Sequence, residues 1–196
     1  MAKRGLGRTA PNPSVGAVIA NETTQELISR GWTQTGGRPH AETEALRSAG
    51  KNASKATLYV TLEPCAHFGV TPPCVDAIIA AQIKRVVVAL PDPDPRTSGA
   101  GLQKLKDAKI DIALGLMASE ANWITMGHIL RQTEKRPFVS LKIATNQKGN
   151  VPSGDGSAPL FVTGPEARAF GHLLRSQADA ILIGSGTIYE IGRAHV

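Results

Sequence analysis

The chain has 196 residues, of which 41% are hydrophobic, 19% charged and 4% aromatic, and its formal net charge is +6. This balance is typical of a globular protein, and with only two cysteines it argues against a disulfide-rich scaffold. No apolar run approaches the ~20 residues of a membrane span, and no hydrophobic segment follows the basic N-terminus, so we expect a cytoplasmic protein with no membrane partner. The basic residues are scattered and do not by themselves predict a nucleic-acid partner.

Short β-branched runs alternate with segments of helical spacing through the first two thirds of the chain. We expect strands at residues 15–20, 57–62, 85–90 and 110–114, and helices at residues 41–49, 75–82, 101–108 and 119–133. This alternation predicts a layered α/β domain over residues 1–136, with helices on both faces of a largely parallel sheet.

A second unit begins after residue 136, where the pattern restarts. We expect a strand at residues 138–144, a loop rich in Gly, Pro and Ser at residues 148–159, a helix at residues 165–177 and a strand at residues 180–183. With roughly fifty residues, this unit is too short to bury a self-sufficient α/β core.

Both cysteines lie in the stretch "EPCAHFGVTPPC", residues 63–74. Together with His40, Cys65 and Cys74 supply one imidazole and two thiolates, which are ligand types that zinc prefers. Three protein ligands leave the fourth position of a zinc ion open, as in catalytic rather than structural sites. Cys74 directly precedes a predicted helix, whose N-terminus should stabilise its thiolate and lower its pKa.

Glu42 follows His40 by two residues. Residues i and i+2 do not share a face of a regular helix, so the pair converges only if His40 lies at the very start of the helix. Glu42 would then address the water activated by the metal, as a proton shuttle, instead of binding the metal itself.

Other interpretations of these residues stay open. The cysteines could be inert buried thiols or, in an oxidising compartment, a disulfide. His67 could bind the metal, contact the substrate or merely pack. We interpret His128 and His172, on later predicted helices, as packing or surface residues.

The order of these residues resembles that of the zinc deaminases, whose signature is H-x-E followed by P-C-x-x-C. Here eight residues separate the cysteines. This expanded form is similar to the bifunctional deaminase–reductase family of riboflavin biosynthesis. The likeness extends to "GRTAPNPSVGAVI", "HAETEAL" and "DPDPRTSGAG".

The resemblance implies a three-layer α/β/α, cytidine-deaminase-like domain that releases ammonia from diaminohydroxyphosphoribosylaminopyrimidine. It implies that zinc is held by His40, Cys65 and Cys74 and that Glu42 is the proton shuttle. It also implies that Asn12 contacts the pyrimidine ring, although turn geometry alone would explain an asparagine between two prolines.

Two positions depart from the family pattern near the expected phosphate. Most relatives carry Lys or Arg where this chain has Val70, and many have His where it has Thr33. The phosphate of the substrate must then find other donors, such as Arg38, backbone amides or His67. We include His67 among the expected substrate-binding residues.

The second unit resembles the start of the family's NADPH-dependent reductase domain, which has a dihydrofolate-reductase-like fold, through "FVTGPEARAFGHLLRSQADAILIGSGT". By that likeness Arg175 contacts substrate, and Phe161 and Thr187 line the NADPH site. We expect an incomplete, inactive reductase domain at residues 137–189, whose full-length parent would be active. Residues 190–196 look like a translated sequencing adapter and are expected to be non-native, and the first helix of the deaminase domain is expected to be clipped.

Two competing functions remain. A deaminase acting on tRNA or single-stranded DNA is favoured by the basic charge, but the long insertion between the cysteines and the few aromatic residues argue against it. A binding module stapled by zinc would be expected to offer four protein ligands. We therefore expect a small phosphorylated pyrimidine as the partner and no nucleic acid, and we leave the formation of a homo-oligomer open.

Overall fold

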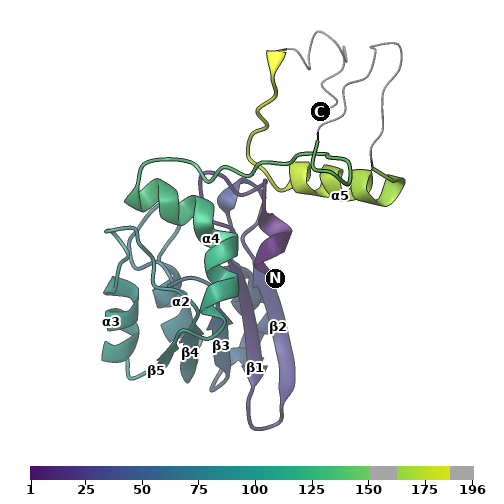
Figure 1. Ribbon diagram of the computed structural model, residues 1–196. Helices are drawn as coiled ribbons and strands as arrows, with labels where there is room; N and C mark the ends of the chain where they lie inside the picture. Colours follow the sequence, from purple (N-terminus) through teal and green to yellow (C-terminus); the bar gives the residue numbers. More distant parts are fainter. Residues whose placement is uncertain (151–162, 186–196) are drawn as a thin grey trace. The chain divides into compact units, whose positions relative to one another are not determined.

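The structure is a computed structural model that describes residues 1–150 and 163–185. The chain divides into two compact units, Met1–Phe138 and Val139–Val196. The first unit holds the sheet and most of the helices (Figure 1). Within the described ranges, no helix combines the length and the apolar character needed to cross a membrane.

The sheet of the first unit has five strands in the order β2-β1-β3-β4-β5. These are β1 (Gly16–Asn21), β2 (Glu26–Trp32), β3 (Thr57–Val60), β4 (Arg85–Val88) and β5 (Asp111–Leu114). Strand β1 runs antiparallel to β2 and to β3, whereas β3, β4 and β5 are parallel. The expected α/β fold is confirmed, but the expectation of a largely parallel sheet is wrong, because a strand absent from the prediction pairs with β1 in a hairpin.

The missing strand, β2, lacks the apolar alternation that identifies a strand in a sequence. Its buried positions are Ser29 and Gly31, where a strand packed on a core usually has large apolar residues. The turn before it is set by Asn21, whose Oδ1 accepts backbone hydrogen bonds from Thr23 and Thr24 at 2.9 and 3.2 Å. The hairpin therefore depends on a polar turn and on close packing of small residues, and neither produces the hydrophobic periodicity from which a strand is predicted.

Four α-helices accompany the sheet: α1 (Ala41–Ala49), α2 (Cys74–Ala80), α3 (Ala100–Asp107) and α4 (Ala118–Thr133). All four were predicted to within two residues. Helix α1 packs closely on β2, because a Cβ on Gly31 would lie 2.2 Å from the carbonyl oxygen of Ala41. Ser29 Oγ donates to the carbonyl of Ala45 at 2.8 Å. These contacts fix the position of the N-terminus of α1.

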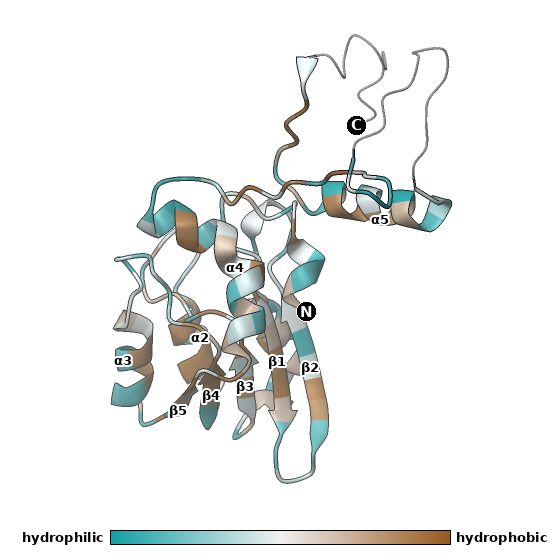
Figure 2. Cartoon of the chain, viewed as in Figure 1, coloured by the Kyte–Doolittle hydropathy of each residue, from teal (hydrophilic) through white to brown (hydrophobic). Residues whose placement is uncertain are grey.

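The core of the first unit is aliphatic, as the low aromatic content predicts. The following side chains are fully buried, with 0% of their surface exposed: Ala17, Ile19, Leu58, Val75, Ile78, Val86, Val88 and Leu105. Figure 2 shows hydrophobic residues along the strands and on α2, and hydrophilic residues on the outer part of α3. Each large aliphatic side chain buried in this way contributes about 1.5–3 kcal/mol.

In the second unit the structure contains helix α5 (Pro165–Ser176), which confirms the predicted helix. The predicted strands at residues 138–144 and 180–183 are wrong, since neither segment is paired within the described residues. Their apolar side chains are largely exposed, with Leu141 at 81% and Leu182 at 98%. A strand needs a neighbour to accept and donate its ladder hydrogen bonds, and a β-branched run alone does not provide one. Residues 151–159 of the predicted loop lie outside the described ranges.

Candidate metal centre

The three predicted metal ligands meet beside the carboxyl end of β3. Cys65 lies in the loop that follows this strand, Cys74 is the first residue of α2, and His40 is the N-cap residue of α1. Their ligand atoms all lie within 4.8 Å of one another. Crevices outside the carboxyl ends of parallel strands are common ligand sites in α/β folds, and this cluster occupies such a position.

The distances in the cluster fit a tetrahedral zinc ion. The Nδ1 atom of His40 lies 3.3 Å from Cys74 Sγ and 3.7 Å from Cys65 Sγ. Zinc bonds of about 2.3 Å to sulfur and about 2.05 Å to nitrogen, at the tetrahedral angle, place those atoms about 3.6 Å apart. Nδ1 is therefore the imidazole nitrogen that would bind the metal. One nitrogen and two sulfurs leave a fourth position for water.

The two cysteines have opposite acidities. The hydrogen bond from the Cys74 thiol lowers the pKa of Cys65 to about 4, and the backbone N–H of Cys74, 3.3 Å from Cys65 Sγ, adds to this effect. Donation to Cys65 and burial both raise the pKa of Cys74. The expectation that Cys74 has the lowered pKa is therefore wrong. The N-terminus of α2 stabilises the thiolate of Cys65 through the backbone amide of Cys74.

Glu42 lies beside the cluster and is almost fully buried, with 4% of its surface exposed. Burial raises its pKa to about 7, while the charge of His40 and a hydrogen bond with Cys74 act in the opposite direction. His40 is extended, with φ −70° and ψ 160°, and lies just before the first helical residue. This N-cap geometry lets two side chains at i and i+2 reach the same site. A carboxyl group with a pKa near neutrality can both accept and return a proton.

The structure also brings Asn12 to His40. Asn12 Nδ2 donates to the carbonyl of Gly37 at 2.8 Å and lies 3.5 Å from His40 Nε2. Gly37 has φ +83°, and a Cβ there would lie 2.9 Å from the Asn12 side chain. The glycine therefore makes room for the asparagine against the imidazole.

His67 is oriented by a threonine that the sequence analysis did not single out. Its Nδ1 lies 3.3 Å from the hydroxyl of Thr97, whose surface is 1% exposed. Thr97 belongs to the loop that follows β4, so this contact joins the loop to the segment between the two cysteines. A hydrogen bond to Nδ1 fixes the orientation of the ring and the direction of its other nitrogen.

A second residue that the sequence analysis missed is Glu63, which is 3% exposed. Its Oε2 accepts hydrogen bonds from the backbone N–H groups of Asp92 and Gly99, at 3.3 and 3.2 Å. Its Oε1 accepts from Gly101 and Leu102, at 3.1 and 3.3 Å. The carboxylate thus holds the loop after β4 and the start of α3 against the segment that leads to Cys65. A glutamate directly before "PC" was the available signal.

The remaining predicted residues lie in the second unit. Arg175 is exposed on α5, with Nη1 3.4 Å from His172 Nδ1. Phe161, Thr187 and residues 190–196 lie outside the described ranges. In the first unit, the side chain of His128 is 7% exposed, and its Nε2 lies 3.0 Å from Asp92 Oδ1.

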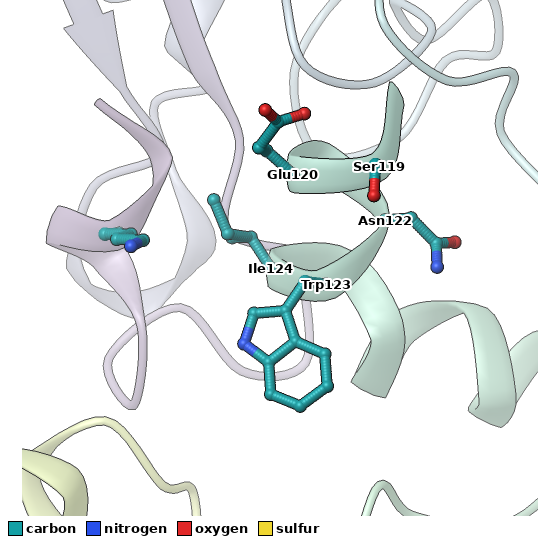
Figure 3. Close-up of a pocket in the computed structure, with 6 residues that line it drawn as sticks. Ser119, Glu120, Asn122, Trp123 and Ile124 are labelled. Carbon is teal, nitrogen blue, oxygen red and sulfur yellow. The ribbon is translucent and has the colours of Figure 1, made fainter. Parts of the chain in front are cut away.

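A hollow of about 510 Å³ lies away from this cluster, beside α4. Figure 3 shows Ile124 projecting from α4 toward the N-terminal 3-10 helix η1 (Ala2–Gly5), with Trp123 below it. None of the residues that line the hollow belongs to the predicted site. The candidate metal ligands and the buried acid converge at the cluster of His40, Cys65 and Cys74, and not at this hollow.

Comparisons with known proteins agree with this geometry. Residues 1–90 match the family model described as "Cytidine and deoxycytidylate deaminase zinc-binding region". The riboflavin biosynthesis protein RibD of Aquifex aeolicus is 45% identical over 190 residues, which cover 97% of this chain and 52% of that protein. RibD of Escherichia coli is 45% identical over 188 residues, which cover 96% of this chain and 50% of that protein.

Solved structures give the same result. Acinetobacter baumannii RibD superimposes with a TM-score of 0.84 at 42% identity, covering 96% of this chain and 52% of that one. A Thermotoga maritima protein, described as a diaminohydroxyphosphoribosylaminopyrimidine deaminase/5-amino-6-(5-phosphoribosylamino)uracil reductase, gives a TM-score of 0.86 at 40% identity and covers 96% of this chain and 53% of that one. The chain spans about half the length of the curated relatives it matches. Its first unit has the cytidine-deaminase-like α/β fold with a mixed five-stranded sheet, and the chain is homologous, over nearly its whole length, to the RibD riboflavin biosynthesis proteins.

Proposed function

We propose that the first unit, residues 1–136, is a zinc-dependent deaminase of riboflavin biosynthesis. Its substrate would be diaminohydroxyphosphoribosylaminopyrimidine, the compound in the name of the Thermotoga maritima relative. The observation that carries this proposal is the convergence of His40, Cys65 and Cys74, with the buried carboxyl of Glu42 beside them. This combination provides three metal ligands and a separate proton carrier, which is the arrangement of the zinc deaminases.

Zinc would be held by His40 Nδ1 and by the two cysteine sulfurs. Bound there, it supplies a Lewis acid that makes water acidic enough to lose a proton near neutral pH. The protein contributes the low pKa of Cys65, which favours the thiolate that metal binding requires.

Glu42 moves the protons. It takes one from the attacking water and passes it to the adjacent ring nitrogen as a carbon–oxygen bond forms at the carbon that bears the amino group. A second proton from the same water then reaches the amino nitrogen, the carbon–nitrogen bond breaks, and ammonia leaves. The pKa of about 7 keeps the carboxyl able to accept and to donate at neutral pH.

Asn12 and His67 would position the substrate. Asn12 is held against the metal cluster by Gly37, and its amide can hydrogen-bond to a pyrimidine ring edge. His67 is held by Thr97 on the loop after β4, so its ring has a defined direction. Both side chains would act on binding and orientation rather than on bond breaking.

We further propose that residues 137–189 belong to an incomplete reductase domain of the dihydrofolate-reductase type, which would use NADPH in the full-length parent. The Escherichia coli match extends over 96% of this chain, which supports a common origin for both units. In this proposal Arg175 contacts substrate, Phe161 and Thr187 line the cofactor site, and residues 190–196 are not part of the domain.

The test is the release of ammonia from diaminohydroxyphosphoribosylaminopyrimidine, with cytidine and adenosine-containing tRNA as competing substrates. We expect turnover of the phosphorylated pyrimidine alone and about one zinc per chain, with much less zinc in Cys65→Ser. Glu42→Gln should keep its zinc and lose on the order of a hundredfold or more in turnover. Glu44→Gln, in the same helical turn, is the control and should remain near the parental rate. Near-parental turnover by Glu42→Gln, or preferred deamination of tRNA, would refute the proposal.

A further inference from the structure

Arg38 lies next to the candidate metal ligands and contacts the segment between the two cysteines. It lies two residues before His40, and its Nη1 donates to the hydroxyl of Thr71 at 2.9 Å. Thr71 belongs to the segment between Cys65 and Cys74. The arginine therefore joins the two parts of the chain that supply the metal ligands. It is half-buried, and Thr71 is exposed, so the pair lies where solvent reaches this segment.

Among the residues that the structure describes, the guanidinium has no carboxylate partner. None of the ion pairs in residues 1–150 and 163–185 includes Arg38, and its only hydrogen bond there is the one to Thr71. A guanidinium has five N–H donors in a planar fork that matches a phosphate, and one bond uses only one of them. The Thr71 hydroxyl, which accepts from Arg38, can itself donate to a second acceptor. The pair therefore offers several unused donors and a positive charge.

The segment between the cysteines has no lysine or arginine of its own. Residues 66–73, "AHFGVTPP", contain no lysine or arginine, and Val70 is 85% exposed without carrying a charge. Thr33 is only 2% exposed, and its hydroxyl accepts a hydrogen bond from the backbone N–H of Val15 at 3.0 Å. Its side chain is therefore buried and already hydrogen-bonded within the protein. For an anion that contacts this segment, Arg38 is therefore the adjacent positively charged side chain.

Gly69 keeps the segment close to the arginine. A Cβ on Gly69 would lie 3.4 Å from Arg38 Nη2, so the backbone of the segment passes directly beside the guanidinium. The guanidinium of Arg38 therefore lies against both Gly69 and Thr71 of this segment.

We propose that Arg38, together with the hydroxyl of Thr71, binds the phosphate of the substrate and gives this chain its preference for a phosphorylated pyrimidine. This inference rests on the proposed deaminase function. Arg38 determines specificity and does not take part in the chemistry. Its contact with phosphate is the same in the ground state and in the transition state, so it should act on KM and leave kcat nearly unchanged.

The experiment compares the phosphorylated substrate with the same compound after removal of its phosphate. A bidentate charged contact is expected to give the parent a preference of about 10- to 100-fold in kcat/KM for the phosphorylated form. In Arg38→Ala this preference should fall to within about threefold of unity, through a higher KM. Arg38→Lys should recover part of it, since the charge remains but the fork is lost. Arg47→Ala, which removes an exposed arginine on α1, is the matched control and should keep the full preference.

Two results would overturn the inference. If Arg38→Ala loses activity equally on both substrates, the arginine is a structural tether; if it keeps the full preference, another group binds the phosphate. Calorimetric titration of the zinc-loaded protein with ribose 5-phosphate separates this inference from the proposed function. If the parent deaminates neither compound, the proposed function fails. The inference about Arg38 then stands if the parent binds ribose 5-phosphate at least tenfold more tightly than Arg38→Ala, and falls if the two bind it equally.

Discussion

Replacement of Glu63 by glutamine should destabilise the first unit far more than a change of one atom usually does. The carboxylate of Glu63 is 3% exposed and accepts four backbone hydrogen bonds, two at each oxygen. Glutamine keeps one oxygen but brings an NH₂ group against two backbone N–H donors, which then have no acceptor. Each buried donor left in this way costs about 1–3 kcal/mol. The expected loss is therefore about 2–6 kcal/mol in the free energy of unfolding.

Urea unfolding of the zinc-loaded chain measures this loss. Both tryptophans of the chain, Trp32 and Trp123, lie in the first unit, so their fluorescence reports on its unfolding. With a slope of about 2 kcal/mol/M, the midpoint of Glu63→Gln should fall by roughly 1–3 M. Glu120→Gln, at an exposed position on α4, is the control and should change stability by less than about 0.5 kcal/mol.

The same variant should weaken zinc binding, since Glu63 holds the segment that leads to Cys65. A loss below about 1 kcal/mol with unchanged zinc affinity would show that the four hydrogen bonds are not needed, and the argument from buried donors would be refuted.

Three further predictions concern other parts of the first unit. Gly31→Ala should destabilise the chain by at least about 2 kcal/mol in urea unfolding, because the new Cβ would lie 2.2 Å from a backbone oxygen of α1. Gly127→Ala, whose Cβ would have its nearest neighbour 4.0 Å away, should stabilise the chain by up to about 1 kcal/mol. Similar values for both variants would contradict the packing argument. The pKa of Asp94 is lowered from 3.8 to about 2, chiefly by hydrogen bonds from an exposed arginine, so its charge should stabilise the fold by about 1 kcal/mol above pH 4 after solvent screening, and by less as the pH falls toward 2. The stability difference between the parent and Asp94→Asn should therefore shrink from pH 6 to pH 3, and a constant difference would exclude this linkage. Thr97→Val should lower kcat/KM by about 3- to 10-fold, since His67 loses the bond that orients it, whereas Thr97→Ser should stay within about twofold of the parent; equal losses in both would point to packing instead.

The metal ligands and the four helices of the first unit were accessible from the sequence because their signals are local. The range of α1 was predicted to the residue, since its apolar spacing and the preceding histidine mark both its face and its start. Ligand chemistry likewise depends on residue type, so His40, Cys65 and Cys74 could be selected before their positions were known.

Other features depended on neighbours that are distant in the sequence. Strand β2 has Ser29 and Gly31 at its buried positions because α1 packs against them, and no apolar alternation records that contact. The predicted strands at residues 138–144 and 180–183 had suitable residues but are not paired within the described residues.

The acidity of the site was also decided by tertiary structure. The residue pattern predicted the ligand types and a helix N-terminus at Cys74. In the folded chain the thiol and the backbone N–H of Cys74 face Cys65, so the stabilised thiolate is Cys65. Burial raises the pKa of Glu42 to about 7. The position of Glu42 two residues after a histidine does not predict that burial. Residue type determines which chemistry is available, whereas hydrogen-bond direction and desolvation depend on atoms that only the folded chain brings together.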